Sequence, residues 1–281
     1  MNHTKRVLAI HDLCSFGRCS LTAAVPVLSA MGFQCCPFPT ALFSNNLTYG
    51  DFANVDCTPT MTKFMDKWQQ LGLGFDAVYS GFLANAGQIS VVRDAVHRFA
   101  GKEGLVVVDP AMADDGKLYA VFGPDIVPEM RKLVGDATVA TPNYTEACLL
   151  TDTAYTPAAG RDVVTSLCRK VAALGPKQVV ITSVPSADAD KITTAAYDAA
   201  SDSYTETVVD RIPFATCGTG DLFTSVLTGS LLRGASVTDS VQTAAGFLTK
   251  TIDYTYHAGS DYREGVQFER FLGLLAPQGQ H

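Results

Sequence analysis

The sequence Cys217-Gly218-Thr219-Gly220-Asp221-Leu222-Phe223 joins the last extended segment of the chain to a segment whose apolar residues have helical spacing. Two glycines let the backbone turn closely around a ligand, and the free N–H groups at a helix start bind anions with help from the helix dipole. Asp221 stands in the first turn, where its carboxylate can accept a proton from a hydroxyl group held against the anion. The stretch therefore predicts phosphate-binding geometry, although Thr219 or Asp221 acting only as a helix cap explains the same pattern.

Short apolar segments rich in β-branched residues alternate with longer segments of helical spacing upstream of this motif. The short segments predict strands buried on both faces, at residues 7–10, 77–79, 105–108, 137–140 and 179–181. The longer segments predict helices at 20–31, 60–71, 86–100 and 163–174. Farther on, 192–197 and 204–209 flank a polar turn as in an antiparallel hairpin, and 221–275 has a helical pattern. The sequence therefore predicts an α/β fold with a mostly parallel sheet, in a single domain over residues 1–281.

The composition is typical of a globular protein that binds a small molecule. Of the 281 residues, 47% are hydrophobic and 17% are charged, which excludes disorder as a description of the whole chain. The formal net charge is −7 and no long basic run occurs, so neither nucleic acid nor a membrane is an expected partner. We find no secretory signal and no apolar stretch of ~18 residues, and the eight cysteines form no Cys-x-x-Cys pair. We therefore expect a cytoplasmic protein with reduced thiols.

Ligands of an open α/β sheet bind beyond the carboxyl ends of its strands, so the residues after each predicted strand are candidates for the site. Those residues are mostly polar: His11-Asp12, Ser80-Gly81-Phe82, Asp109-Pro110, Thr141-Pro142-Asn143 and Thr182-Ser183. Other phosphate-binding motifs are absent, because no Walker loop occurs and Phe223 stands where a Rossmann pattern needs its third glycine. The lack of a Gly-x-Ser-x-Gly motif also weighs against an α/β-hydrolase.

A second motif, Thr141-Pro142-Asn143-Tyr144-Thr145-Glu146, carries two oxygen-bearing side chains three residues apart. This spacing projects Asn143 and Glu146 from one face of the first helical turn. Together with Asp109 at a neighbouring strand end, they suit a hydrated Mg²⁺ that bridges nucleotide phosphates. A capping box, with Asn143 as the N-cap and Glu146 as its partner, fits the spacing equally well. Taken alone, the motif favours the cap.

Candidate substrate contacts lie in the N-terminal loop and in a long connection. Asp12 can grip a small polar ligand, whereas we interpret His11 as a satisfied core histidine and Arg18 as a solvated surface charge. The connection that begins Phe43-Ser44-Asn45 mixes aromatic and amide side chains, as binding lids often do. Phe82 can offer a ring face to an aromatic substrate.

In this order and with these separations, the motifs resemble the ribokinase-like superfamily of small-molecule kinases. The segments at Phe43 and Ser80, with the short first strand, narrow the resemblance to the pyridoxal (vitamin B6) kinases, and it covers nearly the whole chain. It implies a ribokinase-like three-layer α/β/α sandwich that transfers the γ-phosphoryl group of ATP to the 5′-hydroxymethyl group of pyridoxal, pyridoxine or pyridoxamine. It also implies Mg²⁺, a monovalent cation such as K⁺ as an activator, and a homodimer.

The resemblance assigns roles to the residues at matching positions. Asp221 would be the base, with the amides of Gly218, Thr219 and Gly220 as the anion hole. Residues near ATP would be Asn143, Glu146, Thr182, Ser183 and Thr219. Asp109 would stand in the outer shell of the cation, near Glu146. Substrate contacts would come from Asp12, Phe43, Ser44, Asn45 and Phe82.

Three departures from the family pattern concern the substrate. Asp12 replaces a serine that faces the pyridine ring in many B6 kinases, Phe82 replaces a stacking tyrosine, and Ser44-Asn45-Asn46-Leu47 lacks the usual threonine. The preferred vitamer therefore stays open, and hydroxymethylpyrimidine, which close relatives phosphorylate, is an alternative substrate. Further alternatives are a sugar kinase of the same superfamily and a non-catalytic vitamer-binding protein. We expect residues 111–118 to form the lid, and because that segment has no cysteine we assign no covalent role to Cys217.

Overall fold

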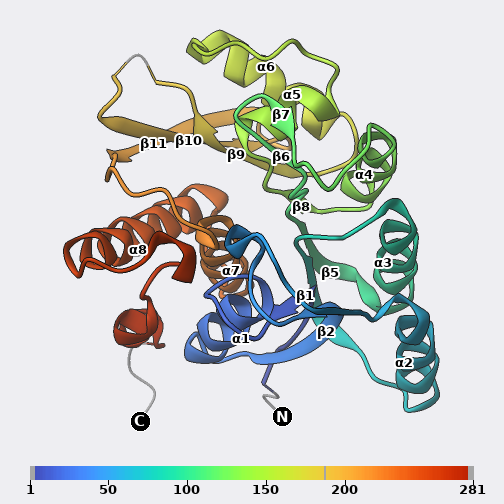
Figure 1. Cartoon of the computed structure of the whole chain (residues 1–281). Helices are drawn as coiled ribbons and strands as arrows, with labels where there is room; N and C mark the ends of the chain where they lie inside the picture. The colour runs from blue at the N-terminus through green and yellow to red at the C-terminus, as the bar shows by residue number, and fades with distance from the viewer. Residues whose placement is uncertain (1–3, 187, 278–281) are drawn as a thin grey trace.

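The computed structural model describes residues 4–186 and 188–277, and one large sheet runs through them (Figure 1). Within these residues its strands are β1 (Arg6–Cys14), β2 (Gln34–Phe43), β3 (Asn54–Asp56), β4 (Phe75–Ser80), β5 (Ala100–Val108), β8 (Val139–Ala140), β9 (Gln178–Val184), β10 (Lys191–Asp198) and β11 (Ser203–Asp210). Their spatial order is β11-β10-β9-β8-β5-β4-β1-β2-β3. Pairing is parallel from β2 to β9 and antiparallel at both edges. The mostly parallel sheet predicted from the sequence is confirmed.

Helices cover both faces of this sheet, which produces three layers (Figure 1). One face carries α1 (Ser20–Ala30), α7 (Thr219–Leu232) and α8 (Val237–His257). The other carries α2 (Thr58–Gln70), α3 (Ala86–Phe99), α4 (Ile126–Gly135), α5 (Tyr144–Leu150) and α6 (Arg161–Ala172). Each side buries its own apolar cluster, because side chains alternate along each strand: Leu8 belongs to one cluster and Val7 to the other. This is the expected α/β/α sandwich.

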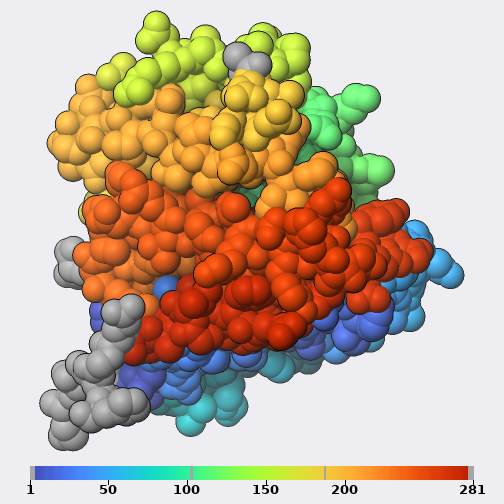
Figure 2. Space-filling model, turned by 90° about the vertical axis from the view of Figure 1, so that its left-hand side faces the viewer, coloured from blue at the N-terminus to red at the C-terminus, as the bar shows by residue number. Residues whose placement is uncertain are grey.

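The remaining elements of the described chain are a short hairpin and three 3₁₀ turns. A separate hairpin pairs β6 (Ala113–Asp114) with β7 (Lys117–Leu118). Short 3₁₀ turns are η1 (Leu47–Tyr49), η2 (Tyr262–Glu264) and η3 (Glu269–Leu275). Figure 2 shows α8 and the C-terminal turns, coloured orange to red, lying across one side of the molecule. Among the helices in the described residues, none has the length and apolar character that crossing a membrane requires.

β5 begins at Ala100, five residues before its expected start, and two other predicted strands continue three or four residues past their expected ends. β1 continues to Cys14, so His11 and Asp12 lie inside the strand, and its register with β2 shifts between His11 and Leu13. β9 continues to Val184, so Thr182 and Ser183 also lie within a strand. In both places pairing with a neighbouring strand continues past the apolar run. The predicted strand at 137–140, by contrast, keeps only Val139–Ala140.

Several elements were not predicted, and β2 and α4 are the longest of them. β2 contains Pro37 and Pro39, which cannot donate to a ladder and which hide a strand from pattern analysis. α4 was missed as well, although Ile126, Met130 and Leu133 face the core with helical spacing. The helical pattern expected over 221–275 is divided between α7, α8 and the 3₁₀ turns.

The helix α7 is buried along nearly its whole length, because it packs against α1 and α8 as well as the sheet. Leu227 in this helix is fully buried. We predict that Leu227→Ala lowers the free energy of unfolding by about 2–5 kcal/mol, through lost burial and the cavity left behind. Urea denaturation followed by circular dichroism measures this loss.

The matched control is Leu274→Ala, because Leu274 is 60% exposed. It should change the free energy of unfolding by no more than about 0.5 kcal/mol. Equal losses of unfolding free energy in the two variants would contradict the importance of burying α7.

Candidate active site

Gly218 sets the start of α7 by a close approach to the segment that precedes α1. Its φ is +81°, and a Cβ atom at this position would lie 2.0 Å from the carbonyl oxygen of Arg18. Only glycine fits such a contact. Leu222 donates to the carbonyl of Gly218 at 3.0 Å, while among the described residues the amides of Thr219, Gly220 and Asp221 have no hydrogen-bond acceptor. These helix-start donors form a cradle for an anion.

The Asp221 carboxylate stands beside this cradle and has one oxygen without a hydrogen-bond donor. Its Oδ2 accepts from the backbone N–H of Ser20 at 2.8 Å, while its Oδ1 lies 3.7 Å from Nδ1 of His11. The side chain is 17% exposed, so a ligand can reach it. Burial raises the pKa of Asp221 to about 6, and the charge of Asp12 acts in the same direction, while the Ser20 bond opposes the rise. The group can thus accept a proton near neutral pH.

The Asp12 side chain is buried and bonds to Ser20, the residue whose backbone amide donates to Asp221. Its Oδ1 accepts from the hydroxyl of Ser20 at 2.6 Å and its Oδ2 from the thiol of Cys14 at 3.2 Å. The residue is only 4% exposed, and burial raises its pKa. Ser20 therefore joins two carboxylates, by its hydroxyl to Asp12 and by its amide to Asp221. A contact between Asp12 and a substrate, as the resemblance implies, stays a prediction.

Asp109 follows β5 and lies next to the cradle. Its Oδ2 is 3.7 Å from the position that a Cβ atom on Gly220 would take, and it accepts one long hydrogen bond from Thr224 at 3.4 Å. Burial, together with the charge of Asp221, raises the pKa of Asp109 to about 8. A buried carboxylate whose charge is stabilised by only this long hydrogen bond among the described residues can bind a cation. Carboxylate oxygens are the ligands that Mg²⁺ prefers. Asp109 therefore fits the predicted position near Mg²⁺.

Asn143 and Glu146 form the capping box that the sequence left open. Asn143 Oδ1 accepts from the Glu146 amide at 2.9 Å, and Glu146 Oε2 accepts from the Asn143 amide at 2.8 Å. Both side chains also reach the β6–β7 hairpin, because Glu146 Oε1 accepts from Met112 N at 2.9 Å and Asn143 Nδ2 donates to Ala113 O at 2.7 Å. Burial raises the pKa of Glu146 well above its usual value, and the charge of Asp109 adds to this. The cap is confirmed, whereas contacts to ATP or Mg²⁺ stay a prediction.

The hairpin held in this way occupies the segment predicted to be a lid. Met112 and Ala113, at its base, are fully buried, while Asp114 and Asp115 toward its tip are exposed. The structure therefore ties the base of the segment to α5.

The predicted substrate residues of the 43–53 loop bond mainly to one another. Phe43 is 7% exposed and packs edge-on against Phe52, with ring centroids 5.2 Å apart. The hydroxyl of Ser44 donates to Asn45 Oδ1 at 2.6 Å, and Asn45 Nδ2 donates to the carbonyl of Asp51 at 2.9 Å. These contacts shape the loop, and the structure shows no side chain here aimed at Asp221.

Of the other residues predicted to contact a ligand, Phe82 follows β4, whereas Thr182 and Ser183 lie within β9. Phe82 is half-buried, and its ring centroid lies 5.6 Å from that of Phe122, so another ring already covers part of it. The amide of Thr182 donates to the carbonyl of Pro142 at 3.0 Å, which joins β9 to the start of the Asn143 motif. Ser183 is exposed, with φ at +52°.

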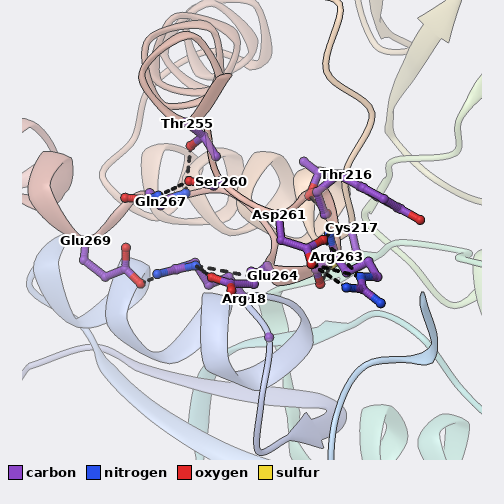
Figure 3. Close-up of polar contacts among 12 residues, drawn as sticks. Arg18, Thr216, Cys217, Thr255, Ser260, Asp261, Arg263, Glu264, Gln267 and Glu269 are labelled. Atoms are coloured by element: carbon purple, nitrogen blue, oxygen red, sulfur yellow. Dashed lines mark hydrogen bonds and ion pairs between the residues drawn. The ribbon is translucent and has the colours of Figure 1, made fainter. Parts of the chain in front are cut away.

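The sequence does not indicate a C-terminal contribution from η2, whose backbone carbonyls accept hydrogen bonds from three parts of the site. Figure 3 shows Arg18, Thr216 and Cys217 beside this turn. Thr216 Oγ1 donates to the carbonyl of Tyr262 at 2.5 Å. Cys217 Sγ and Asn46 Nδ2 donate to the carbonyl of Arg263, at 3.6 and 2.7 Å. The Arg18 amide donates to the carbonyl of Glu264 at 3.1 Å. Because these contacts span 46 to 246 residues of sequence, no local pattern indicates them.

For two residues near the N-terminus, Arg18 and His11, the structure differs from what the sequence indicates. Arg18 is not a free surface charge, because its guanidinium pairs with Glu269 at 2.5 Å and with Glu264 at 3.7 Å (Figure 3). His11 is fully buried, but within the described residues neither ring nitrogen has a hydrogen-bond partner, so it is not a satisfied core histidine. For Cys217, a hydrogen bond from the Cys19 thiol lowers the pKa, and the structure adds no covalent partner.

Comparisons with known proteins agree with this arrangement. The model of a family described as phosphomethylpyrimidine kinase matches residues 18–265. A crystal structure from Bacteroides thetaiotaomicron, described as a phosphomethylpyrimidine kinase, is 38% identical and covers 100% of this chain and 96% of its own, with a TM-score of 0.96. A second crystal form of that protein, with pyridoxal, has a TM-score of 0.94 and covers 99% of this chain and 98% of its own.

Two further relatives are described as pyridoxal kinases. The structure from Lactobacillus plantarum is 30% identical, covers 97% of each chain and has a TM-score of 0.89. The protein from Deinococcus radiodurans is 27% identical and covers 98% of this chain and 92% of its own.

The capping box generates a stability prediction. In Glu146→Ala the buried amides of Met112, Ala113 and Asn143 lose their acceptor. We expect the free energy of unfolding to fall by about 2–4 kcal/mol, since each unpaired buried donor is costly. Urea denaturation gives the loss, and hydrogen exchange should show faster exchange at the Met112 and Ala113 amides.

Glu129→Ala is the control, because Glu129 forms an ion pair with the exposed Lys132 side chain. Its cost should be at most about 0.5 kcal/mol. Unchanged exchange at Met112 in Glu146→Ala would contradict the described role of the glutamate.

Proposed function

Because this chain belongs to the phosphomethylpyrimidine kinase family, we propose that it is an ATP-dependent kinase for B6 vitamers, the pyridoxal kinase reaction. It transfers the γ-phosphoryl group of ATP to the 5′-hydroxymethyl group of pyridoxal, pyridoxine or pyridoxamine. The observation that carries the proposal is the Asp221 carboxylate beside the unpaired amides of Thr219 and Gly220. The relatives described as pyridoxal kinases, and the Bacteroides protein crystallised with pyridoxal, support the choice of substrate.

The reaction needs a base, an anion site and a means of positioning two substrates. Asp221 Oδ1 accepts the proton of the 5′-hydroxyl group as its oxygen attacks the γ-phosphorus. A new O–P bond forms, the bond between the γ-phosphorus and the bridging oxygen breaks, and ADP leaves with the electron pair. The amides of Gly218, Thr219 and Gly220 stabilise the negative charge on the transferred group. Asp221, with a pKa near 6, is mostly ionised at neutral pH and ready to accept the proton.

Nucleotide and cation are assigned to the residues between β5 and α5. Asp109 would stand in the outer shell of Mg²⁺, and the ion, when bound, would neutralise phosphate charge. Asn143 and Glu146 would act near Mg²⁺ and the phosphates, and their side chains already bind the backbone of the β6–β7 hairpin. Thr182, Ser183 and Thr219 would line the rest of the ATP site. A monovalent cation such as K⁺ rests on the resemblance alone.

The vitamer ring would lie near Phe43, Ser44, Asn45 and Phe82, with the carboxylate of Asp12 on its polar side. We also propose a single-domain protein of the cytoplasm. All eight cysteines lie in the described residues and are free thiols there, which favours a reducing compartment. A homodimer is proposed from the resemblance to pyridoxal kinases.

A second candidate function is hydroxymethylpyrimidine kinase, which the name of the matching family favours. The purified protein should be given Mg·ATP with pyridoxal, pyridoxine, pyridoxamine, hydroxymethylpyrimidine, ribose or fructose 6-phosphate, with ADP release and product mass as readouts. We expect phosphorylated B6 vitamers. Turnover of only the pyrimidine, or only a sugar, would replace the proposed substrate, and tight pyridoxal binding without any turnover would identify a non-catalytic vitamer-binding protein.

Asp221→Asn tests the base. Asparagine keeps an acceptor for the Ser20 amide but cannot take the proton, so we expect kcat to fall on the order of 10²-fold or more while the KM for ATP stays nearly constant. Steady-state kinetics with pyridoxal measures both constants. Near-normal turnover would mean that Asp221 only caps α7.

The pH dependence follows from the same group. Since Asp221 must be ionised and its pKa is raised to about 6, kcat/KM should fall as the pH drops below about 6. For an unperturbed carboxyl the fall would occur near pH 4. A pH–rate profile between pH 4.5 and 8.5 distinguishes the two cases.

A further inference from the structure

His11 is a buried histidine that the proposed reaction does not yet use. It lies in β1 on the side of α1 and α7, and its ring packs edge-to-face on Tyr79, with centroids 4.4 Å apart. The residue is 0% exposed, and in the described chain Nδ1 and Nε2 both lack a hydrogen-bond partner. A buried polar group without a hydrogen-bond partner destabilises the fold, so its presence requires an explanation.

An acceptor close to the ring is the Asp221 oxygen that accepts no hydrogen bond from the described residues. His11 Nδ1 lies 3.7 Å from Asp221 Oδ1, whereas Oδ2 is already bonded to the Ser20 amide. A shift of less than about 1 Å brings the pair to hydrogen-bonding distance. Burial lowers the pKa of His11 to about 3, so the ring is neutral and carries one N–H group.

We propose that His11 is a positioning residue for the base: its Nδ1–H donates to Oδ1 of Asp221 and holds the carboxylate toward the substrate hydroxyl group. The inference rests on the proposed function, in which Asp221 accepts the hydroxyl proton. A carboxylate oxygen has two lone pairs, so Oδ1 can accept from His11 and from the hydroxyl group at once.

Gly81 supplies independent support, because the backbone after β4 is shaped to the His11 ring. A Cβ atom at Gly81 would lie 2.2 Å from His11 Nδ1 and 2.5 Å from its Cε1. Gly81 has no positive φ, so the ring, rather than the backbone conformation, excludes a side chain here. Any larger residue would displace the nitrogen that faces Asp221.

The groups around the ring explain why a donor is needed. Asp221 faces it from α7, and the Tyr79 ring packs on it from β4. The charge of Asp221 in turn raises the pKa of Asp109 at the end of β5. Burial and the charge of Asp12 favour a protonated Asp221. An N–H group on Oδ1 favours the ionised form. Loss of the donor should therefore raise the pKa of Asp221.

The experiment compares His11→Phe with His11→Asn in the full chain. Phenylalanine keeps an aromatic ring on Tyr79 but has no hydrogen-bond donor. We therefore expect kcat to fall about 10- to 100-fold while the KM for ATP stays within about 2-fold of the wild-type value. The acid limb of the pH–rate profile should move to higher pH. The Nδ2 of asparagine can occupy the place of Nδ1, so His11→Asn should recover most of the rate and the original limb. His97→Phe, at a histidine side chain that is 58% exposed, is the matched control and should change neither.

A readout independent of turnover is the carboxyl titration of Asp221, followed by ¹³C NMR with Asp221→Asn for assignment. It should move to higher pH in His11→Phe and return in His11→Asn. An unmoved titration and acid limb in His11→Phe, with only a lower melting temperature, would overturn the proposal. So would an asparagine variant that behaves like phenylalanine. The wild type could phosphorylate none of the substrates while the Asp221 titration still shifts in His11→Phe and returns in His11→Asn. In that case the contact between His11 and Asp221 stands and the proposed function fails.

Gly81→Ala displaces the ring without removing it and should reproduce the kinetic signature of His11→Phe. In a His11→Ala background, Gly81→Ala should cost little more, because the clashing ring is gone. Additive losses from the two substitutions would contradict the coupling.

Discussion

The contact between the start of α7 and the segment leading into α1 determines where every group of the site lies. Gly218 rests against the carbonyl of Arg18, at a distance that leaves no room for a side chain. This contact brings the amide of Ser20 to the Asp221 carboxylate and leaves the first amides of α7 open to a ligand. The turn η2 closes the junction from outside, where Gly265 pairs with Arg18. Two helix starts, rather than one, therefore build the site.

The same junction concentrates negative charge in a chain that is already acidic. Asp12, Asp109, Asp221 and Glu146 are largely buried near one another, and burial raises the pKa of each. Such groups weaken the fold at neutral pH, since ionisation is easier in the unfolded chain. The arrangement is understandable if a cation and a proton of the substrate are shared among these carboxylates during the reaction. An anionic nucleotide would then be attracted by backbone amides and a metal ion, although the net charge of the protein is −7.

Local chemistry explains which features the sequence predicts correctly. The glycine motif at 218–220 and the capping box of Asn143 and Glu146 depend on neighbours in the chain, and the alternation of apolar runs predicts the parallel sheet. Features that depend on distant contacts were missed. Arg18 was taken for a solvated charge because Glu264 and Glu269 lie some 250 residues away. β2 was hidden by its two prolines, although it pairs with β1 along most of its length.

In the proposed reaction the hydroxyl group of a B6 vitamer meets Asp221 while a phosphate occupies the start of α7. A crystal structure with pyridoxal, Mg²⁺ and a non-hydrolysable ATP analogue would show both contacts. We expect the 5′-hydroxyl oxygen within hydrogen-bonding distance of Asp221 Oδ1 and the terminal phosphate on the amides of Gly218, Thr219 and Gly220. A vitamer bound with its hydroxymethyl group away from Asp221, or a phosphate held elsewhere in the fold, would contradict it.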